Sequence, residues 1–472
     1  MTSALALITA SSYAAFLLLR RNTPLLHRLA IQSVGVLDGM LSRGDEDEKL
    51  AALETATRRL MRTLLSFLIL LGTGGALLCL PWLVADEVGL NAWLTWPGML
   101  AASLGGTIAF FLPRNLPGAV STSGHGASHY SALDQLLHRL ILNHPHLHMR
   151  LMRREVATWR KRGGVPHTSF LWVTGLARAG TTSMLERLVQ TKAFHSLHYG
   201  NMPLVLAPSL WKRFHNPGSG EKRERSHGDG ILVGLDSAEA LEEVFFQAST
   251  NRSYITPEAL EAHSVDIDMH RDYLDYQGIA LASSDRPQAM YVAKNNNALL
   301  RYPAMRLLNR DFHVVFMFRE PLVHAASLLA MHRKYCAMQA SDPFVREYMD
   351  WLAHHEFGLG HLPFRFPSST SLPTGNKDSL DYWLDVWINH HREALAMDPH
   401  HLHFVSYEAY CADPNGVLKS LGESLGVQIP ATHHKAFVNN RSPEEEAHPD
   451  HLAEALAMHA ELMARSSLTR HS

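Results

Sequence analysis

One stretch of the sequence, FLWVTGLARAGTTSMLERLVQ at residues 170–190, constrains the fold more than any other. Its apolar start, residues 170–173, has the length and composition of a buried strand. Gly175 and Gly180 bracket a turn, and the hydroxyl-rich segment that follows opens a helix with apolar residues at helical spacing. Such a turn directs backbone N–H groups and the positive end of the helix dipole to one point. The stretch therefore predicts an anion-binding loop that suits a phosphate.

The loop matches the outline of a nucleoside triphosphatase loop except at one position. That motif has a lysine directly after its last glycine, whereas this chain has Thr181. Without the lysine, the loop lacks the charge that reaches the β- and γ-phosphates of a nucleotide, which argues against a Mg-dependent triphosphatase. Arg178 can supply a cation from within the loop instead.

A second set of polar residues follows the predicted strand at residues 313–318. Arg319 comes directly after this strand, and Ser327 lies on the helix predicted to follow. In an open α/β sheet, ligands bind beyond the carboxyl ends of the strands, where the glycine loop also lies. Arg319, as a bidentate donor, and Ser327 can therefore converge on one phosphate. Upstream, the run YVAKNNN predicts a short strand that leads into Lys294.

Together, the two motifs resemble the superfamily of sulfotransferases that use 3′-phosphoadenosine 5′-phosphosulfate (PAPS). The resemblance covers about residues 130–445, and the runs KNNN, FREPLVHAASLL and WLAHHEFG are similar to a bacterial branch of the superfamily. It implies an α/β fold, a P-loop-like three-layer sandwich with a mostly parallel sheet. It also implies that the 5′-phosphosulfate is held by Arg178, Ala179, Gly180, Thr181, Thr182 and Ser183, and the 3′-phosphate by Arg319 and Ser327.

The expected reaction needs stabilisation of negative charge more than a metal. Sulfuryl transfer resembles phosphoryl transfer, and the singly charged sulfonate can be stabilised by cations and backbone N–H groups, so no metal is expected. Arg178 is the candidate that stabilises the leaving 5′-phosphate. Lys294 is the second catalytic candidate, because related carbohydrate sulfotransferases have a lysine in the corresponding position. The alternative for Lys294 is a surface lysine before a polar turn.

The general base is harder to assign from the sequence. Many members of the superfamily use a glutamate about twenty residues after the loop, but residues 195–201 contain no carboxylate. His227, in the run RERSHGDG, is the first candidate, since a neutral imidazole accepts a proton near neutral pH. The next candidates are His198, Asp229 and the adjacent pair Glu242 and Glu243, of which only one could face the site. Solvent-exposed or ion-paired carboxylates are the alternative for that pair.

The first 114 residues are expected to form a membrane module of two or three helices. The apolar runs 4–19, 64–85 and 93–112 approach the ~20 residues that a helix needs to cross a bilayer. The first run is of marginal length, so it could lie on the membrane; a cleaved signal peptide is the other alternative. The basic residues that flank the runs, Arg20, Arg21, Arg58, Arg59, Arg62 and Arg114, all fall on one side. By the positive-inside rule that side is cytoplasmic, and the C-terminal domain lies there too.

The rest of the chain is predicted to form a polar linker and one large domain. Residues 115–128 are rich in Gly, Ser, Thr and Pro, and residues 129–472 follow as the sulfotransferase domain. We expect two helices separated at Pro145, another over 237–247, and a later one that ends at Gly360. A net charge of −2 gives no reason to expect a nucleic-acid partner, and three scattered cysteines fit a reducing compartment.

The sequence thus predicts an integral protein of the bacterial inner membrane with a cytoplasmic catalytic domain. This domain is expected to move a sulfuryl group from PAPS to a hydroxyl or amine by in-line transfer. A membrane location favours a lipid or a lipid-linked glycan as the acceptor. The alternatives are a P-loop kinase for a nucleotide or small molecule that uses Mg-ATP, and a membrane-attached binding protein with a degenerate site.

Overall fold

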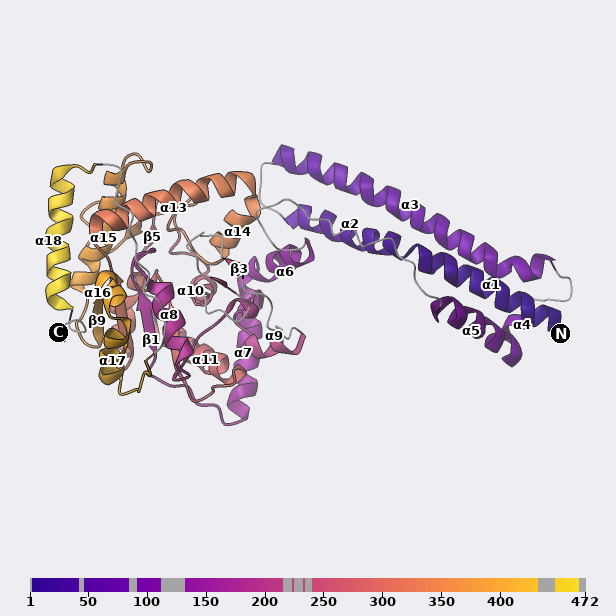
Figure 1. The fold of residues 1–472 in the computed structure, drawn as a ribbon, viewed down its shortest axis with the longest axis horizontal. Helices are drawn as coiled ribbons and strands as arrows, with labels where there is room; N and C mark the ends of the chain where they lie inside the picture. Colours follow the sequence, from indigo (N-terminus) through magenta and orange to yellow (C-terminus); the bar gives the residue numbers. More distant parts are fainter. Residues whose placement is uncertain are drawn as a thin grey trace. The chain divides into compact units, whose positions relative to one another are not determined.

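The computed structural model describes eight ranges of the chain: residues 2–41, 46–84, 91–111, 132–214, 223–224, 232–233, 240–431 and 446–466. The chain divides into two compact units, Met1–Arg139 and Leu140–Ser472 (Figure 1). The predicted linker at residues 115–128 lies outside the described residues, so the predicted boundaries at 114 and 129 remain predictions.

The N-terminal unit is helical. Its helices are α1 (Thr2–Arg21), α2 (Thr23–Leu41), α3 (Glu46–Val84), α4 (Asn91–Leu94) and α5 (Trp96–Phe111). Helix α2 continues the line of α1 beyond a break at Asn22, and α3 runs back beside both as the second arm of a hairpin (Figure 1). Helix α2 is not expected from the sequence, because its apolar run over Arg28–Leu37 is short.

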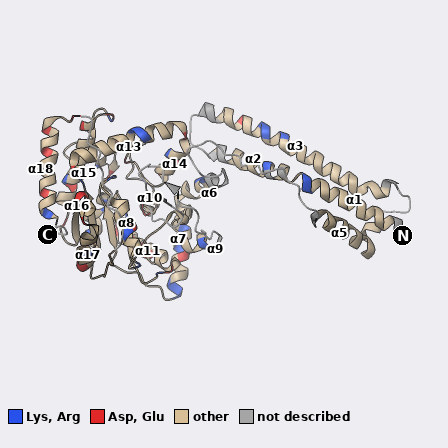
Figure 2. Ribbon diagram, in the orientation of Figure 1, with Lys and Arg blue, Asp and Glu red and all other residues tan. Residues whose placement is uncertain are grey.

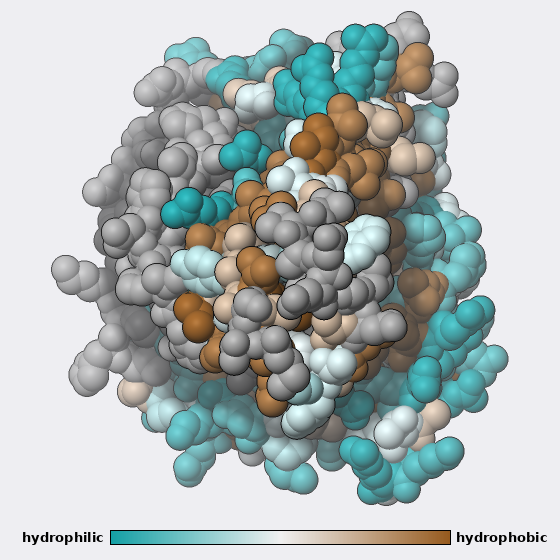
Figure 3. Space-filling model, turned by 90° about the vertical axis from the view of Figure 1, so that its right-hand side faces the viewer, coloured by the Kyte–Doolittle hydropathy of each residue, from teal (hydrophilic) through white to brown (hydrophobic). Residues whose placement is uncertain are grey.

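Two helices among the described residues are long and apolar enough to cross a membrane, over Ala4–Arg21 and Leu50–Trp82. Helix α5, within the third predicted run, has 16 residues and a length of about 24 Å, against a hydrocarbon core of about 30 Å. Figure 2 shows almost no charged residues in α5, in α1 before its basic residues or in α3 after its basic residues. Figure 3 views the molecule from the side on which the N-terminal unit lies in Figure 1, and apolar residues form much of the central surface in this view.

Helices α1 and α5 pack closely through small residues. A Cβ atom on Gly105 would lie 2.3 Å from the carbonyl oxygen of Thr9, so only glycine permits this approach. Ala101 and Ala109, one turn to either side of it, are also buried. Small residues four apart are typical of contacts between membrane helices. At the far end of α5, Arg20 donates a hydrogen bond to Ala109 O. The two helices therefore run parallel, and the C-terminal end of α1 lies near that of α5.

The C-terminal unit is built on a five-stranded sheet. Its strands, in spatial order, are β2 (Phe194–His195), β6 (Met290–Lys294), β1 (Leu171–Thr174), β7 (His313–Phe318) and β9 (Leu402–Ser406). Every neighbouring pair is parallel, so all five carboxyl ends lie at one edge. Parallel strands require crossover connections, which the intervening helices provide. The predicted α/β fold with a parallel sheet is confirmed.

Helices cover both faces of this sheet. On one face, Leu171 and Val173 pack in a core with α8 (Thr181–Gln190) and α17 (Pro414–Leu425). On the other face, Trp172 contacts Tyr273 of α11 (Ile267–Ser283), and Phe316 contacts two histidines of α15 (Leu380–Ala396). Strands β1 and β7 are buried throughout their length because of this double cover, as expected of parallel sheets. The three layers are visible in Figure 1.

The other elements surround this sandwich. They are α7 (Pro145–Lys161), η1 (Tyr199–Asn201), α9 (Pro208–Phe214), α10 (Glu243–Ser249), η2 (Ala298–Leu300), α12 (Tyr302–Leu308), α13 (Pro321–Ser341), α14 (Pro343–Trp351), α16 (Tyr407–Ala412) and α18 (Pro449–Arg465). Helix α6 (Ala132–Leu142) spans the boundary between the two units. Two small sheets pair β3 (Arg223–Glu224) with β4 (Leu232–Val233), and β5 (Leu260–Glu261) with β8 (Phe364–Arg365).

Three predicted helices can be compared with these elements. Pro145 separates two helices as expected, because it begins α7. The helix expected over 237–247 is observed from Glu243, and residues 237–239 lie outside the described residues. The helix expected to end at Gly360 ends at Trp351 instead, and residues 352–360 form turns. In this last case the prediction was wrong, because apolar spacing alone does not mark a helix end.

Candidate functional site

The glycine loop connects β1 directly to α8 and needs glycine at both of its ends. Gly175 has φ +142°, and a Cβ atom there would lie 2.3 Å from the carbonyl oxygen of Met317 on β7. Gly180 has φ +92°, and its Cβ atom would lie 2.5 Å from the ring of Tyr407. Both conformations are strained for other residues. The two glycines therefore let β7 and Tyr407 pack tightly against the loop.

The loop leads into the first turn of α8, where three of the predicted binding residues lie. Thr181 and Thr182 are buried, and the hydroxyl of Ser183 lies 3.4 Å from that of Tyr410. The first N–H groups of a helix have no partner within the helix, and they carry the positive end of its dipole. Ala179, within the loop, is fully buried. This arrangement can bind an anion at the end of β1.

Arg178, Arg319 and Ser327 come together at this loop, from three separate elements. Arg178 Nε donates a hydrogen bond to Ser327 Oγ (3.4 Å), and Arg319 Nη1 donates to the carbonyl oxygen of Arg178 (3.5 Å). Both bonds are long. The Arg319 guanidinium also lies over the ring of Tyr407, 4.9 Å from its centroid. The predicted residues of the two motifs are therefore neighbours, although 141 residues separate the two arginines in the sequence.

The charge of Arg319 is buried without a matching anion. Its side chain is 5% exposed, and within the described residues no carboxylate lies at ion-pair distance from it. Burial lowers the pKa of Arg319, and the neighbouring charge of Arg178 lowers it further against the opposing effects of Tyr407 and Glu408. Burying the Arg319 guanidinium beside the half-buried Arg178 is costly unless an anion binds to Arg319. The geometry thus favours a ligand with a phosphate at this point.

His324 also contacts the loop, and it is not expected from the sequence. It lies on α13, is fully buried, and its Nε2 donates a hydrogen bond to the carbonyl oxygen of Ala177 (2.7 Å). Burial lowers the pKa of His324 well below its ordinary value, so the ring is neutral at physiological pH. The spacing could have indicated it, because His324 and Ser327 lie on one face of a helix at positions i and i+3. Tyr407, which follows β9, was missed as well.

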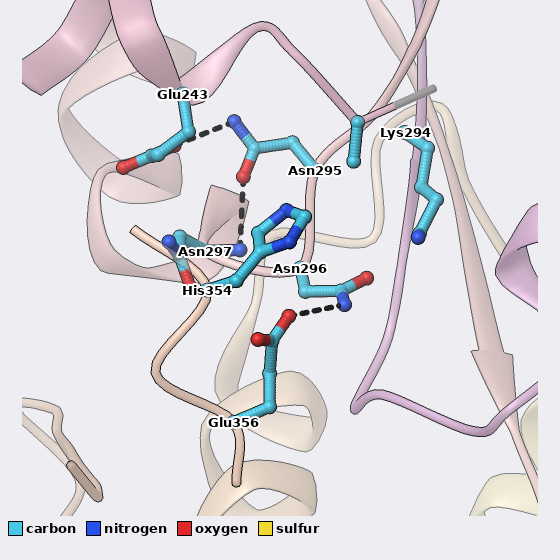
Figure 4. Close-up of a pocket in the computed structure, with 8 residues that line it drawn as sticks. Glu243, Lys294, Asn295, Asn296, Asn297, His354 and Glu356 are labelled. Atoms are coloured by element: carbon cyan, nitrogen blue, oxygen red, sulfur yellow. Dashed lines mark hydrogen bonds between the residues drawn. The ribbon is translucent and has the colours of Figure 1, made fainter. Parts of the chain in front are cut away.

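Lys294 lies at the carboxyl end of β6, next to β1 and the loop. Val173 of β1 is its partner in the sheet register, and the lysine side chain is 9% exposed, so it is not a surface lysine. It lines a small pocket together with Ala240, Glu243, Asn295, Asn296, Asn297, His354 and Glu356 (Figure 4). All of the lining residues but one are polar or charged. A cation, amides, carboxylates and an imidazole therefore converge beside the anion-binding loop.

The adjacent carboxylates are both buried, and they differ in charge state. Glu242 accepts hydrogen bonds from the hydroxyl of Tyr273 and from Asn295 (3.4 Å), and burial raises the pKa of Glu242 to about 7. For Glu243, burial would raise the pKa, but the charge and hydrogen bonds of Arg301 outweigh it and keep the pKa below its usual value. Arg301 is fully buried and donates two hydrogen bonds to Glu243 (2.8 and 2.5 Å).

Of this pair, Glu243 is the one that lines the pocket. From the sequence, only one of Glu242 and Glu243 is expected to face the site, and only Glu243 lines this pocket. The alternative of an ion-paired carboxylate applies to Glu243, whereas the alternative of solvent exposure is wrong for both.

The other base candidates from the sequence are placed elsewhere or not described. His198 caps the short helix η1 after β2, where its backbone N–H donates to Asn201 Oδ1 (2.9 Å). His227 and Asp229 lie outside the described residues, so their roles remain predictions. Within the described residues, no group of three or more His, Cys, Asp or Glu side chains is arranged to hold a metal ion.

Comparison with known proteins gives matches among solved structures only. No family model matches the chain, and no curated protein matches its sequence. Sulfotransferase STF1 from Mycobacterium tuberculosis is 15% identical over 72% of this chain and 88% of its own, with a TM-score of 0.35. Sulfotransferase STF9 from Mycobacterium avium is 13% identical over 70% and 77%, with a TM-score of 0.38. A sulfotransferase from Alicyclobacillus acidocaldarius is 16% identical over 62% and 92%, with a TM-score of 0.29.

All of these matches are sulfotransferases from bacteria, the group of proteins that the sequence motifs resemble. The identities and TM-scores are low, so the roles of individual residues depend on the geometry of the loop and the pocket. At this level of likeness, the chain is similar to bacterial sulfotransferases.

Proposed function

We propose that this chain is a membrane-attached sulfotransferase that transfers a sulfuryl group from PAPS to an acceptor hydroxyl. The observation that carries the proposal is the buried guanidinium of Arg319, which lies beside Arg178 at the glycine loop with no carboxylate paired to it among the described residues. PAPS carries phosphate at both its 3′ and 5′ positions, so it can supply an anion to each part of this site. A loop with Thr181 in place of lysine suits such a nucleotide better than a triphosphate.

Different residues bind the two ends of the nucleotide. The 5′-phosphosulfate binds to the loop and the start of α8, at Ala179, Gly180, Thr181, Thr182 and Ser183. Arg319 and Ser327 bind the 3′-phosphate, with Arg319 as a fork of donors. Arg178 contacts Ser327 and belongs to the loop, so it can stabilise charge on either group.

Transfer moves one sulfur atom between two oxygens. The acceptor oxygen forms a bond to sulfur, the bond from sulfur to the 5′-phosphate oxygen breaks, and the electron pair of that bond stays on the phosphate. Arg178 and the N-terminus of α8 stabilise the negative charge that develops on the 5′-phosphate. Lys294 stabilises the sulfuryl group during its transfer. A base must remove the proton of the acceptor hydroxyl. His227 was the first candidate for this role on the sequence alone.

The N-terminal unit is proposed to anchor the enzyme in the membrane. Its support is the presence of two helices of sufficient length and apolarity, together with the close α1–α5 contact through Gly105. The parallel run of α1 and α5, opposed by α3, agrees with basic flanks on one side of the bilayer. We assign that side, and the catalytic domain, to the cytoplasm. Membrane attachment favours an acceptor that is a lipid or is linked to one.

The test uses nucleotide binding to the full-length protein in detergent. We expect 3′-phosphoadenosine 5′-phosphate to bind much more tightly than adenosine 5′-phosphate. Arg319→Ala should weaken the first nucleotide by about 30-fold or more, because it removes a buried charged contact of about 2 kcal/mol or more, and should affect the second little. Arg333→Ala is the matched control, since this exposed arginine on α13 pairs with Asp378. Equal losses for both nucleotides in Arg319→Ala would refute the assignment.

A further inference from the structure

Helix α7 presents a row of unpaired cations on its outer face. Arg150, Arg154 and Lys161 are exposed, and among the described residues none of the three has an ion-pair partner. Their spacing of four and seven residues places them within about 40° of one another around the helix axis. Leu147, which is 42% exposed, continues the row at its N-terminal end. These four residues form a basic stripe about 21 Å long.

The opposite face of α7 is packed, so the direction of the basic stripe is fixed. His148 is buried there, and the backbone N–H of Leu206 donates a hydrogen bond to its Nε2 atom (3.1 Å). Trp159 packs against α11 at Gly278, where a Cβ atom would lie 2.3 Å from the indole ring. These contacts prevent rotation of the helix about its axis, and the stripe stays on the surface.

The basic stripe contains no acidic residue. Helix α7 has a single carboxylate, Glu155, and this side chain is bound elsewhere. Its two oxygens accept hydrogen bonds from the backbone N–H groups of Ser209 (2.9 Å) and Leu210 (3.1 Å) in the first turn of α9. Figure 2 shows the excess of basic residues along α7. No group of this helix therefore neutralises the stripe.

Other arginines of the same helix are neutralised by α11. Arg153 pairs with Asp272 (3.2 Å), and Arg160 pairs with Asp275 (2.5 Å). The chain as a whole has a net charge of −2, so it is not a generally basic protein. The unpaired cations of the stripe are therefore a local feature of this face.

Such a stripe is unfavourable for a helix that faces only water. Arg150 and Arg154 are four residues apart, a spacing at which like charges destabilise a helix. Helix faces that are merely solvated usually alternate charges of opposite sign. An anionic surface offsets the repulsion, and it matches the order of side chains in the stripe. Cations contact the headgroups of an anionic bilayer, and an exposed leucine enters the boundary between headgroups and acyl chains.

Helix α7 also follows closely on the helices of the proposed membrane anchor. Helix α5 ends at Phe111 and α7 begins at Pro145, with residues 112–144 between them. In a chain anchored as proposed, this short connection holds α7 at a high effective concentration near the bilayer. Weak contacts with headgroups are then sufficient for docking. A lipid surface is thus favoured over an acidic protein as the partner.

From these observations we infer that the basic stripe of α7 docks the C-terminal unit on an anionic lipid bilayer. The inference rests on the proposed membrane anchor and goes beyond the proposed reaction. Arg150, Arg154 and Lys161 contact lipid phosphates, and Leu147 enters the headgroup boundary. Each basic residue near an anionic surface strengthens binding about fivefold, so the three together contribute about 100-fold.

The test measures hydrogen exchange of the full-length protein in two kinds of nanodisc. One kind contains phosphatidylcholine alone, and the other contains equal parts of phosphatidylcholine and the anionic phosphatidylglycerol. We expect the amides of residues 147–161 to exchange at least tenfold more slowly in the anionic nanodiscs, because opening of the helix then requires undocking. The difference should disappear at 1 M NaCl, where the Debye length is only about 3 Å.

A triple variant removes the cations and keeps long polar side chains in the stripe: Arg150→Gln, Arg154→Gln and Lys161→Gln. It should exchange equally in the two kinds of nanodisc. In phosphatidylcholine it should match wild type, which shows that it is folded. The control changes three exposed cations of other elements and alters the net charge equally, through Lys192→Gln, Arg310→Gln and Lys419→Gln. This control should keep the dependence on phosphatidylglycerol.

Two results would overturn the inference and favour an acidic protein as the partner of the stripe. They are equal exchange of wild type in both kinds of nanodisc, and a lipid dependence that survives in the triple variant. Elution of the protein apart from the nanodiscs would overturn the membrane anchor as well. Neither the binding of 3′-phosphoadenosine 5′-phosphate nor its loss in Arg319→Ala depends on the stripe, so a failure of the proposed reaction is detected separately.

Discussion

The buried carboxyl of Glu242 should make the free energy of unfolding depend on pH. Its pKa is raised from an ordinary 4.5 to about 7, because burial penalises the charged form more than the hydrogen bonds of Tyr273 and Asn295 favour it. Between these two pH values the native state holds a proton that the unfolded state has lost. The stabilisation that Glu242 contributes should therefore be fully present below about pH 4.5 and be lost as pH rises through about 7. At ~1.4 kcal/mol per pH unit, the decline amounts to roughly 3 kcal/mol.

Replacing this carboxyl with a neutral amide should remove this contribution. Buried histidines with lowered pKa values, such as His148, His263 and His390, change stability in the opposite direction, so the variant is compared with wild type at each pH. Relative to wild type, the free energy of unfolding of Glu242→Gln should rise by roughly 2 to 3 kcal/mol between pH 5 and 8. The assay is urea unfolding of the detergent-solubilised chain, followed by tryptophan fluorescence. Trp172 is a suitable reporter, because its Nε1 donates to the hydroxyl of Tyr273 (2.7 Å), which in turn donates to Glu242.

The neighbouring carboxylate provides the control. Glu243→Gln should destabilise the protein by about 3–5 kcal/mol across the same range, because it leaves the fully buried Arg301 without its partner. Its difference from wild type should depend little on pH. A difference between Glu242→Gln and wild type that does not change with pH would refute the reasoning, since it would show that Glu242 does not titrate in this window.

Two further predictions concern the loop and the membrane unit. Gly180→Ala should lower the affinity for 3′-phosphoadenosine 5′-phosphate at least tenfold, because its Cβ atom would clash with the Tyr407 ring at 2.5 Å in a backbone conformation with φ +92°; near-normal affinity in a binding assay would contradict this. A fluorescent protein fused to the C-terminus should fluoresce in the cytoplasm of bacterial cells, whereas an alkaline phosphatase fused there should be inactive. The opposite pattern of reporter activity would refute the proposed topology.

The central part of the fold could be predicted because its signals are local. The strand at 313–318 is observed at those residues, and the strand, glycine turn and helix within 170–190 occur in that order. Parallel strands end at a common edge, so the meeting of Arg178, Arg319 and Ser327 followed from the sheet alone. These contacts depend on short-range patterns and on one general rule of topology.

The pocket could not be predicted in the same way. His354 reaches it only because the chain turns after Trp351 with a positive φ at Ala353, and no residue there signals that turn. The charge states of Glu242 and Glu243 depend on Tyr273 and Arg301, which are distant in the sequence. Such partners become visible only when the chain is folded.

The central claim is that this chain transfers a sulfuryl group, and it can be tested directly. The full-length protein in nanodiscs would be incubated with sulfur-labelled PAPS and a lipid extract from bacterial membranes, and the products would be separated and weighed by mass spectrometry. The account predicts labelled products heavier by one sulfonate, formed by wild type and lost in Lys294→Ala. Phosphate transfer from Mg-ATP in place of sulfuryl transfer, or tight binding of PAPS with no labelled product, would contradict it.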